Sequence, residues 1–352
     1  MLALTGHGYG HLAQCAPVVN SLRQQLPELL LTVCSSLPHA VVAARIDREF
    51  DYRQTELDPV LRMLNAWEVD IAASRQVYRE FHRNREQGCQ HDIDLLEQLS
   101  PDLVLADIPW RILSAAAHCG IPGVGLCSLN WAAIYAAYCE DNSEDRDILE
   151  QMMNGYRAAC LFLAPTPAIP MPDLDNVVTT GPIARRGSRQ QAALLERCAV
   201  DGVTRAVLVA LGGIVTSLPV DNWPHIEGVI WIFTDAVQSR RHDMVDSNAL
   251  EMPFIDVLAS VDVVLTKPGY GTYAEAVCNG VPVLTIARRD WPETAYLNSW
   301  VQQHGHLEVM TRAQFFSGDF VSQVNALLAK EPGPGIEPAG IQQAADQIRS
   351  LL

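Results

Sequence analysis

A glycine-rich segment in the C-terminal half has the residue types that bind anions. It reads Lys267-Pro268-Gly269-Tyr270-Gly271-Thr272 and lies between an apolar run and a stretch of helical character. Gly269 and Gly271 let backbone amides approach a bulky anion, and the helix that follows directs its positive end at the turn. Thr272 can add a hydroxyl. The segment therefore predicts a site for a diphosphate group.

An acidic residue follows in the same predicted helix, which is expected to end at Gly280. Glu275 lies about one turn into this helix, where a carboxylate can accept hydrogen bonds from the hydroxyls of a ribose. The alternative is that Glu275 stabilises the helix dipole from the first turn and that the glycines only shape the chain. Without a fold context, glycines in a strand-to-helix turn are more often structural than ligand-binding.

A second glycine-rich turn lies near the first residue. The stretch Thr5-Gly6-His7-Gly8-Tyr9-Gly10-His11 separates a short strand from a helix expected over residues 12–25, with Pro17 in its interior unless the helix breaks there. NAD binding is disfavoured, because the third glycine follows the second too soon and the next predicted strand ends without an acidic residue. The turn carries two imidazoles, His7 and His11, and the sequence does not say which of them faces a ligand.

The chain alternates short apolar runs with longer segments of helical period. This alternation is typical of βαβ units and parallel sheets, in which ligands bind at the carboxyl ends of the strands. A polar segment over residues 57–91 is expected to be helical. The predicted strands cover residues 2–4, 29–33, 103–105, 123–127, 161–164, 207–210, 229–233, 263–265 and 281–286.

Length and proline content predict two domains. A chain of 352 residues exceeds what one hydrophobic core usually supports. The segment 165–188 holds five prolines and two glycines, which is typical of a domain boundary. We expect an N-terminal Rossmann-like domain over residues 1–183, a second one over residues 184–335, and a closing helical segment over residues 336–352.

The segment Asp262 to Pro282 resembles the donor-site region of glycosyltransferases of the GT-B type. The resemblance is greatest to the bacterial peptidoglycan N-acetylglucosaminyltransferase and the secondary-metabolite glycosyltransferases. The segment is also similar to the glycosyltransferase-like half of plant L-arabinokinase, which has Gly-Tyr-Gly-Thr and a following Glu in the same order. The resemblance implies an α/β protein with two Rossmann-like, doubly wound domains that face each other across a cleft.

The resemblance also implies a donor site. By position, Gly271 and Thr272 bind the diphosphate and Glu275 holds the ribose of a nucleotide-sugar, with UDP or TDP as the nucleotide. Many relatives have Asp-Gln or Gln-Gln just before an Asn that matches Asn298, whereas this chain has Glu293-Thr294. The candidate donor-binding residues are Gly212 and Gly213, in a turn that faces the donor phosphates in relatives, with Lys267, Gly269, Tyr270, Gly271, Thr272, Glu275, Glu293 and Asn298.

Gly10-His11 resembles the Gly-His dipeptide that GT-B enzymes place where acceptor and donor meet. In many inverting relatives this His is the general base on the acceptor hydroxyl, oriented by an Asp that matches Asp107 here. An imidazole can take the proton as the hydroxyl attacks, and a carboxylate stabilises the imidazolium that forms. The alternative is that His11 lines a helix start and Asp107 caps the next helix.

The acceptor side of the predicted site includes Gly8, Gly10 and Trp131. Trp131 lies in a stretch similar to one in the arabinokinase half, where Trp and Tyr follow a strand. Its ring could stack on an acceptor, and core packing is the alternative.

Composition narrows the partners. The formal net charge of −16 disfavours binding to nucleic acid. The nine cysteines form no Cys-x-x-Cys pair, so neither a metal site nor a disulfide framework is expected. No transmembrane segment is predicted, which leads us to expect a cytoplasmic protein. The sequence does not define the oligomeric state.

The leading hypothesis is a metal-independent glycosyltransferase without a cofactor, which moves a sugar from a nucleotide-diphosphate donor to a hydroxyl acceptor. One alternative is a GT-B-like module that binds nucleotide-sugars without transfer. Another is a sugar-nucleotide 2-epimerase, although no converging acidic cluster supports it. Kinase activity is not implied, because the resemblance is to the glycosyltransferase-like half of arabinokinase and a Walker-type loop is absent.

Overall fold

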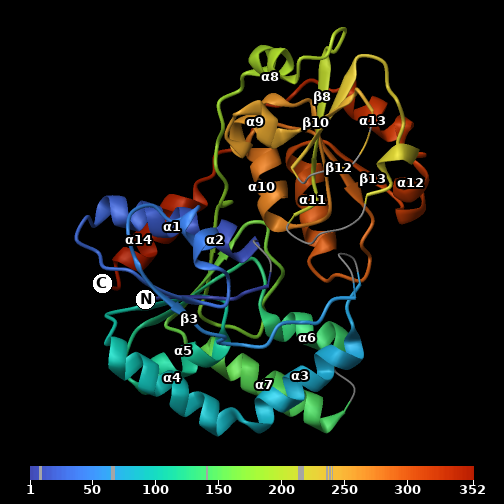
Figure 1. Ribbon diagram of the computed structural model, residues 1–352. Helices are drawn as coiled ribbons and strands as arrows, with labels where there is room; N and C mark the ends of the chain where they lie inside the picture. The colour runs from blue at the N-terminus through green and yellow to red at the C-terminus, as the bar shows by residue number, and fades with distance from the viewer. Residues whose placement is uncertain are drawn as a thin grey trace. The chain divides into compact units, whose positions relative to one another are not determined.

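The chain forms two compact units. The computed structural model describes residues 1–7, 10–64, 68–139, 142–212, 218–234, 237, 239 and 241–352. Unit 1 comprises Met1–Ile183 together with Ala339–Leu352, and unit 2 comprises Ala184–Pro338 (Figure 1).

Unit 1 contains a seven-stranded sheet in the order β3-β2-β1-β4-β5-β6-β7, and every neighbouring pair is parallel. The strand order reverses between β1 and β4, so the turns that follow these two strands open at the switch point of the sheet. The strands are β1 Leu2–Leu4, β2 Thr32–Ser35, β3 Asp51–Gln54, β4 Val104–Asp107, β5 Gly123–Leu126, β6 Leu161–Pro165 and β7 Val177–Thr180.

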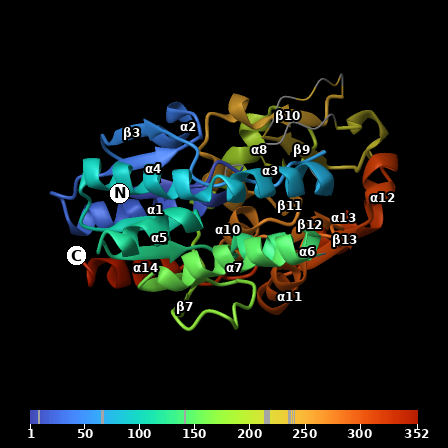
Figure 2. The same cartoon turned by 90° about the horizontal axis from the view of Figure 1, so that it is seen from below.

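Helices cover both faces of this sheet. In Figure 1, α1, α2 and α14 lie on one side and α4, α5 and α7 on the other, and Figure 2 shows α4, α5 and α7 side by side. The last helix, α14, packs against α1, so the chain returns to unit 1 after completing unit 2. The helices are α1 Gly10–Gln25, α2 His39–Ala43, α3 Ile71–Arg83, α4 Arg85–Leu99, α5 Trp110–His118, α6 Trp131–Cys139, α7 Ser143–Ala158 and α14 Gly340–Arg349.

Unit 2 contains a six-stranded parallel sheet in the order β10-β9-β8-β11-β12-β13. Here the strand order reverses between β8 and β11, which makes the turns after these strands the switch point. The strands are β8 Arg205–Ala210, β9 Val229–Phe233, β10 Met244–Asp246, β11 Val263–Thr266, β12 Val283–Ile286 and β13 Leu307–Met310.

Aromatic side chains form part of the core of unit 2, next to its sheet. Trp223 packs on Trp231, Phe315 and Phe320 with ring centroids 5.3 to 5.5 Å apart. On the sheet, α13 packs against β11, β12 and β13, while α10 is flanked by α9 and α11. The helices are α8 Gln191–Cys198, α9 Phe254–Ser260, α10 Tyr270–Cys278, α11 Thr294–His304, α12 Arg312–Ser317 and α13 Val321–Leu328, with short 3-10 turns η1 Val220–Asn222 and η2 Ser247–Leu250.

The four strands that the sequence did not predict, β3, β7, β10 and β13, lie at the edges of the two sheets. Most of their residues are at least partly exposed, so these strands lack the continuous apolar runs of the central strands. A pattern of apolar runs finds only strands that are buried on both faces.

The helices of unit 1 differ from the sequence prediction in one segment and answer a question that it left open in another. The prediction that residues 57–91 are helical is wrong for residues 57–64 and 68–70, which are irregular apart from a bridge between Met63 and Val69. α3 begins only at Ile71, where Asp70 caps it by accepting a hydrogen bond from the Ala73 amide. α1 runs through Pro17 as one helix.

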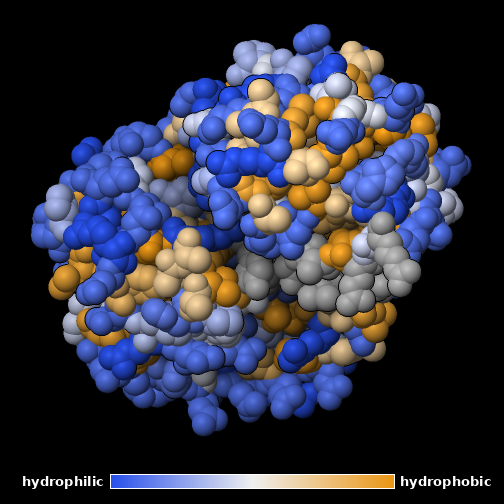
Figure 3. Space-filling model, turned by 45° about the horizontal axis from the view of Figure 1, so that its top comes forward, coloured by the Kyte–Doolittle hydropathy of each residue, from blue (hydrophilic) through white to orange (hydrophobic). Residues whose placement is uncertain are grey.

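Much of the face in Figure 3 is hydrophilic, and apolar residues form smaller groups between the polar ones. Exposed large apolar side chains include Leu30 and Leu64. Within the described ranges, no helix combines the length and the apolar character needed to cross a bilayer.

The contact between α5 and α7 gives a test of the packing. A Cβ at Gly155 would lie 2.6 Å from the backbone oxygen of Trp110, so the two helices must move apart to accept it. Although alanine favours a helix over glycine, we expect Gly155→Ala to lower the free energy of unfolding by about 1–3 kcal/mol. Urea denaturation measures this, and Asn154→Ala on the exposed side of α7 is the control. Equal stability of the two variants would contradict the close contact.

Candidate functional site

The switch point of unit 1 brings His11 and Asp107 together. Asp107 is the last residue of β4, and His11 is the second residue of α1, which follows the turn after β1. Nδ1 of His11 lies 2.8 Å from Oδ1 of Asp107, and both residues are buried. The amide of Thr5 donates to the Asp107 carbonyl oxygen at 2.8 Å and ties the two turns together.

Asp107 is held in an environment with opposing effects on its charge. Burial raises the pKa of its carboxyl group above the usual value, while His11 and the Cys127 thiol lower it. A carboxylate at this position holds the Nδ1 proton of the imidazole and leaves Nε2 to accept a proton from a ligand. In the described part of the chain, Nε2 has no hydrogen-bond partner.

Cys127 is a member of this cluster that the sequence did not reveal. Its Sγ lies 3.7 Å from Nδ1 of His11, and it follows β5, the strand next to β4. The sequence signal was present, because residues that end neighbouring parallel strands reach the same edge of a sheet. His11, Asp107 and Cys127 are also the types of residue that bind metals. However, the 2.8 Å between Nδ1 and Oδ1 is shorter than the roughly 3.3 Å expected for two ligands of one tetrahedral zinc ion.

Trp131 begins α6 and packs on the same imidazole. Its ring lies 5.4 Å from that of His11 and 5.3 Å from that of His7, and its side chain is almost completely buried. In this conformation the indole supports the two imidazoles and offers no open face to an acceptor. Of the other residues predicted on the acceptor side, Gly10 begins α1, and Gly8 lies outside the described residues.

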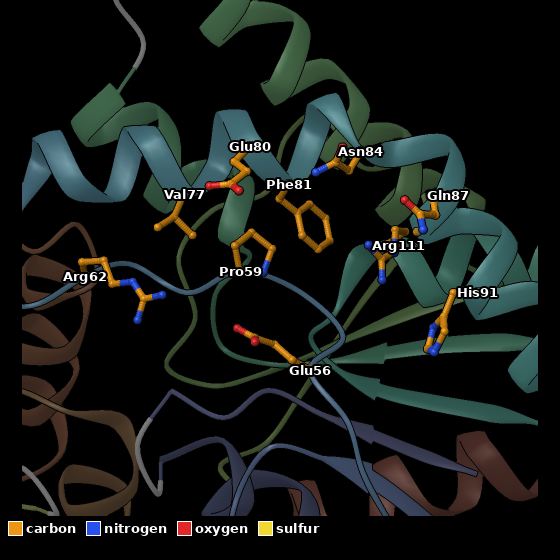
Figure 4. Close-up of a pocket in the computed structure, with 11 residues that line it drawn as sticks. Glu56, Pro59, Arg62, Val77, Glu80, Phe81, Asn84, Gln87, His91 and Arg111 are labelled. Atoms are coloured by element: carbon orange, nitrogen blue, oxygen red, sulfur yellow. The ribbon is translucent and has the colours of Figure 1, made fainter.

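A pocket of about 480 Å³ lies elsewhere in unit 1, between α3, α4 and the segment after β3 (Figure 4). Arg111 forms part of its wall and is fixed by Asp92, with Nε and Nη2 donating to the carboxylate at 2.6 and 3.1 Å. The guanidinium also lies 4.4 Å from the centre of the Phe81 ring. The lining residues are Glu56, Pro59, Arg62, Val77, Glu80, Phe81, Asn84, Gln87, Gly88, His91 and Arg111.

The switch point of unit 2 joins two of the predicted turns. Gly269 is the N-cap residue of α10, so Tyr270, Gly271 and Thr272 form the first turn of that helix. Gly212 follows β8 with φ of +77°, which suits glycine, and its Cβ position lies 3.6 Å from Cε of Lys267. The neighbouring Gly213 lies outside the described residues.

Lys267 and Arg288 make this edge of unit 2 cationic. Burial, and secondly the charge of Arg288, lower the pKa of the Lys267 ammonium to about 8. Arg288 is itself buried, and its guanidinium lies 4.3 Å from the centre of the Trp291 ring. The sequence interpretation missed Arg288, although its position just after β12 was a usable signal.

The remaining donor candidates all have protein partners. Oε1 of Glu275 accepts from Nε of Arg185 at 2.9 Å, and Glu275 is largely buried. Oδ1 of Asn298 accepts from the Tyr273 hydroxyl at 2.9 Å. Glu293 is buried and accepts from the Trp291 indole at 3.4 Å. Glu275 is the sixth residue of α10, so it lies beyond the first turn, where a stabilising effect on the helix dipole would be strongest.

Comparisons with known proteins were made on sequence and on structure. No protein-family model matches the chain. L-arabinokinase from Arabidopsis thaliana is 24% identical over 344 residues, which are 94% of this chain and 32% of that protein. The chain therefore spans about a third of the length of this curated relative.

Solved structures resemble the chain along almost its whole length. The calicheamicin glycosyltransferase CalG4 has a TM-score of 0.64 at 17% identity, and the glycotransferase of kitacinnamycin has 0.63 at 15%. The glycosyltransferase VinC, solved in complex with dTDP, has 0.58 at 17%. Each alignment covers 99% of this chain and 94% of the other.

These similarities define the class of fold. The chain has the GT-B fold of glycosyltransferases, with two Rossmann-like units built on parallel sheets. The predicted fold class and the predicted resemblance are both confirmed.

The Cys127 thiol gives a test of the buried cluster. Removing it leaves the Asp107 carboxyl with fewer favourable contacts, so the pKa of that carboxyl rises further. A carboxyl whose pKa is raised by folding lowers stability above that pKa, and this cost fades as the pH falls toward the unfolded value of about 4. We expect Cys127→Ala to be less stable than Cys127→Ser by about 1 kcal/mol at pH 8, with a smaller difference at pH 5.

Urea unfolding of both variants at the two pH values measures this difference. A gap between the variants that does not change with pH would argue against an effect of the thiol on the carboxylate.

Proposed function

We propose that this chain is a glycosyltransferase that moves a sugar from a nucleoside-diphosphate donor to a hydroxyl group of a small-molecule acceptor. The observation that carries the proposal is the buried hydrogen bond between His11 and Asp107 at the switch point of unit 1. The GT-B fold supports the same function, because solved proteins with this fold include many glycosyltransferases.

In the proposed reaction, Nε2 of His11 takes the proton of the acceptor hydroxyl. The hydroxyl oxygen forms a bond to the anomeric carbon of the sugar as the bond from that carbon to the diphosphate oxygen breaks. The electron pair of the broken bond leaves with the diphosphate. Asp107 stabilises the imidazolium that forms, so the proton is held without a metal ion or cofactor.

We assign donor binding to unit 2. Backbone amides at the start of α10 can donate to the phosphates, and this end of the helix is electropositive. Gly212 and Lys267 border the same turn, and Glu275 is the candidate for the ribose hydroxyls. We take UDP or dTDP as the nucleotide, and VinC was solved with dTDP.

We assign acceptor binding to the pocket between α3 and α4. Its wall offers carboxylates, guanidinium groups and amides, which suit a molecule with several hydroxyls, and Phe81 provides an apolar face. Arg111 follows Asp107 by four positions in the chain, so α5 links this pocket to the strand that ends at Asp107. We place the protein in the cytoplasm, where its nine free cysteines would remain reduced.

The general base gives a direct test. We expect His11→Ala to lower kcat by about 10²–10⁴, because the proton acceptor is lost, while the affinity for UDP stays within a factor of about three. Release of UDP or dTDP from nucleotide-sugars, with a panel of hydroxylated acceptors, measures turnover. His7→Ala is the matched variant, since His7 packs on the same Trp131.

Loss of turnover in His7→Ala with full activity in His11→Ala would reverse the assignment of the base. If the unmodified protein binds UDP but shows no turnover with any acceptor, it is a binding module and not an enzyme. Conversion of UDP-N-acetylglucosamine without an acceptor would instead indicate an epimerase.

Glu275 gives a test of the ribose contact. We expect Glu275→Gln to weaken UDP binding about tenfold and to leave pyrophosphate binding unchanged, because only UDP has ribose hydroxyls. Isothermal titration calorimetry measures both affinities. Arg185→Gln is the control: it breaks the same ion pair, which is partly exposed and contributes at most about 1 kcal/mol. Equal weakening of UDP by both variants would mean that the ion pair, and not a ribose contact, is responsible.

A further inference from the structure

Two buried hydroxyl groups hold the backbone that directly follows Asp107. The amide of Ile108 donates to Oγ1 of Thr5 at 3.3 Å, and the Ile108 carbonyl oxygen accepts from the Tyr156 hydroxyl at 3.0 Å. Thr5 directly follows β1 and Tyr156 lies near the end of α7, so the two hydroxyl groups come from distant parts of the chain. Both backbone polar groups of Ile108 are therefore fixed by side chains.

The same two hydroxyl groups also hold Trp131, whose ring packs on His11. The backbone amide of Trp131 donates to the Tyr156 hydroxyl at 3.1 Å. Its indole Nε1 donates to Oγ1 of Thr5 at 3.5 Å, the longest of the four hydrogen bonds. Trp131 is the first residue of α6, so these contacts fix the beginning of that helix and, with it, the indole 5.4 Å from the His11 imidazole.

Each hydroxyl group therefore connects the surroundings of His11 with those of Asp107. One of its hydrogen bonds reaches the residue after Asp107, and the other reaches the indole residue beside His11. Thr5, Trp131 and Tyr156 are almost completely buried, so water does not compete for these hydrogen bonds. The four hydrogen bonds thus restrict how far the imidazole and the carboxylate can move apart.

The Tyr156 hydroxyl uses both of its hydrogen-bonding capacities in this arrangement. A phenol has one O–H donor and can also accept, and here it donates to the Ile108 carbonyl and accepts from the Trp131 amide. That amide lies in the first turn of α6, where the helix itself offers no acceptor. Phenylalanine at position 156 would keep the ring but leave both groups without this partner.

We propose that Tyr156 and Thr5 are positioning residues, which keep the His11 imidazole in the tautomer that has its proton on Nδ1. Within the ranges that the structure describes, neither hydroxyl forms a hydrogen bond to the imidazole or to the Asp107 carboxylate, so both act through Ile108 and Trp131.

The tautomer depends on the 2.8 Å between Nδ1 of His11 and Oδ1 of Asp107. If the carboxylate moves away, the tautomer with the proton on Nε2 gains population. In that tautomer Nε2 is a donor and cannot accept a proton from a hydroxyl group. This inference rests on the proposed function in one respect, namely that Nε2 takes the proton of the acceptor.

Nitrogen NMR of the full chain with 15N-labelled histidine reports the tautomer without any substrate. The spectra are recorded at pH 9, above the range in which imidazoles ordinarily titrate, and the His11 signals are assigned by their loss in His11→Ala. We expect one tautomer in the unmodified chain and a mixture of both in Tyr156→Phe and in Thr5→Val. Thr5→Ser keeps the hydroxyl and should restore the single tautomer.

Turnover gives a second measurement, with the donor and acceptor that the nucleotide-release assay identifies. Tyr156→Phe and Thr5→Val should each lower kcat by about tenfold to a hundredfold, because the base is displaced, while KM for the nucleotide-sugar stays within a factor of about three. Thr5→Ser should recover most of kcat.

Tyr135→Phe is the matched control. Tyr135 lies on α6 and is fully buried, and its hydroxyl donates to Oδ1 of Asp145 on α7 at 3.0 Å. This variant also removes a buried hydroxyl between α6 and α7, so it should lower the urea midpoint of unfolding as Tyr156→Phe does. It should change neither the His11 spectrum nor kcat, because it contacts neither Ile108 nor Trp131 through its hydroxyl.

The spectra decide the inference, and turnover decides the proposed function. An unchanged His11 spectrum in both Tyr156→Phe and Thr5→Val overturns the positioning role, as does the same spectral change in Tyr135→Phe. If Tyr156→Phe does not fold, the comparison of Thr5→Val with Thr5→Ser decides alone. Absence of turnover in the unmodified chain would count against a transferase, while the spectra would still show whether the two hydroxyl groups position the imidazole.

Discussion

The reversal of strand order in each sheet is the constraint on which the candidate site of each unit depends. Where neighbouring strands lead to helices on opposite faces, the turns at their carboxyl ends separate and leave their polar groups accessible. In unit 1 the strands β1 and β4 create such a point and hold His11 and Asp107 there. In unit 2 the strands β8 and β11 create the second, which holds Gly212 and Lys267. The side chains at the two switch points differ, but in both units the same backbone arrangement positions them.

The two sites handle charge in opposite ways. In unit 1 the carboxylate of Asp107 has a hydrogen-bond partner in the imidazole of His11, inside a buried cluster closed by Cys127 and Trp131. The edge of unit 2 gathers positive groups on a chain whose formal net charge is −16.

The sequence predicted the central strands because they are buried on both faces and consist of apolar runs, as in Val229–Phe233. It missed the edge strands, such as Asp51–Gln54, whose exposed residues follow no such run. The site was predictable where a side chain lies beside a glycine turn in the chain, as His11 and Lys267 do. Cys127 and Arg288 also follow predicted strands, which was a usable signal, but the sequence does not show which strands pair and so which side chains become their neighbours. Glu275 pairs with Arg185, and Asn298 pairs with Tyr273. These are likewise tertiary contacts, and no local pattern in the sequence indicates them.

The return of α14 to unit 1 has a consequence for the order in which the chain can fold. Gly181 donates its amide to Gln343 at 2.7 Å, and Gly340 donates its amide to Pro182 at 3.1 Å, so residues more than 150 positions apart close the first unit. Unit 2 is continuous in sequence and needs no later segment. During synthesis, unit 2 can therefore complete its fold while unit 1 still exposes the surface of α1 that α14 covers. Unit 1 is therefore synthesised first, but its fold is completed only after α14 has been made.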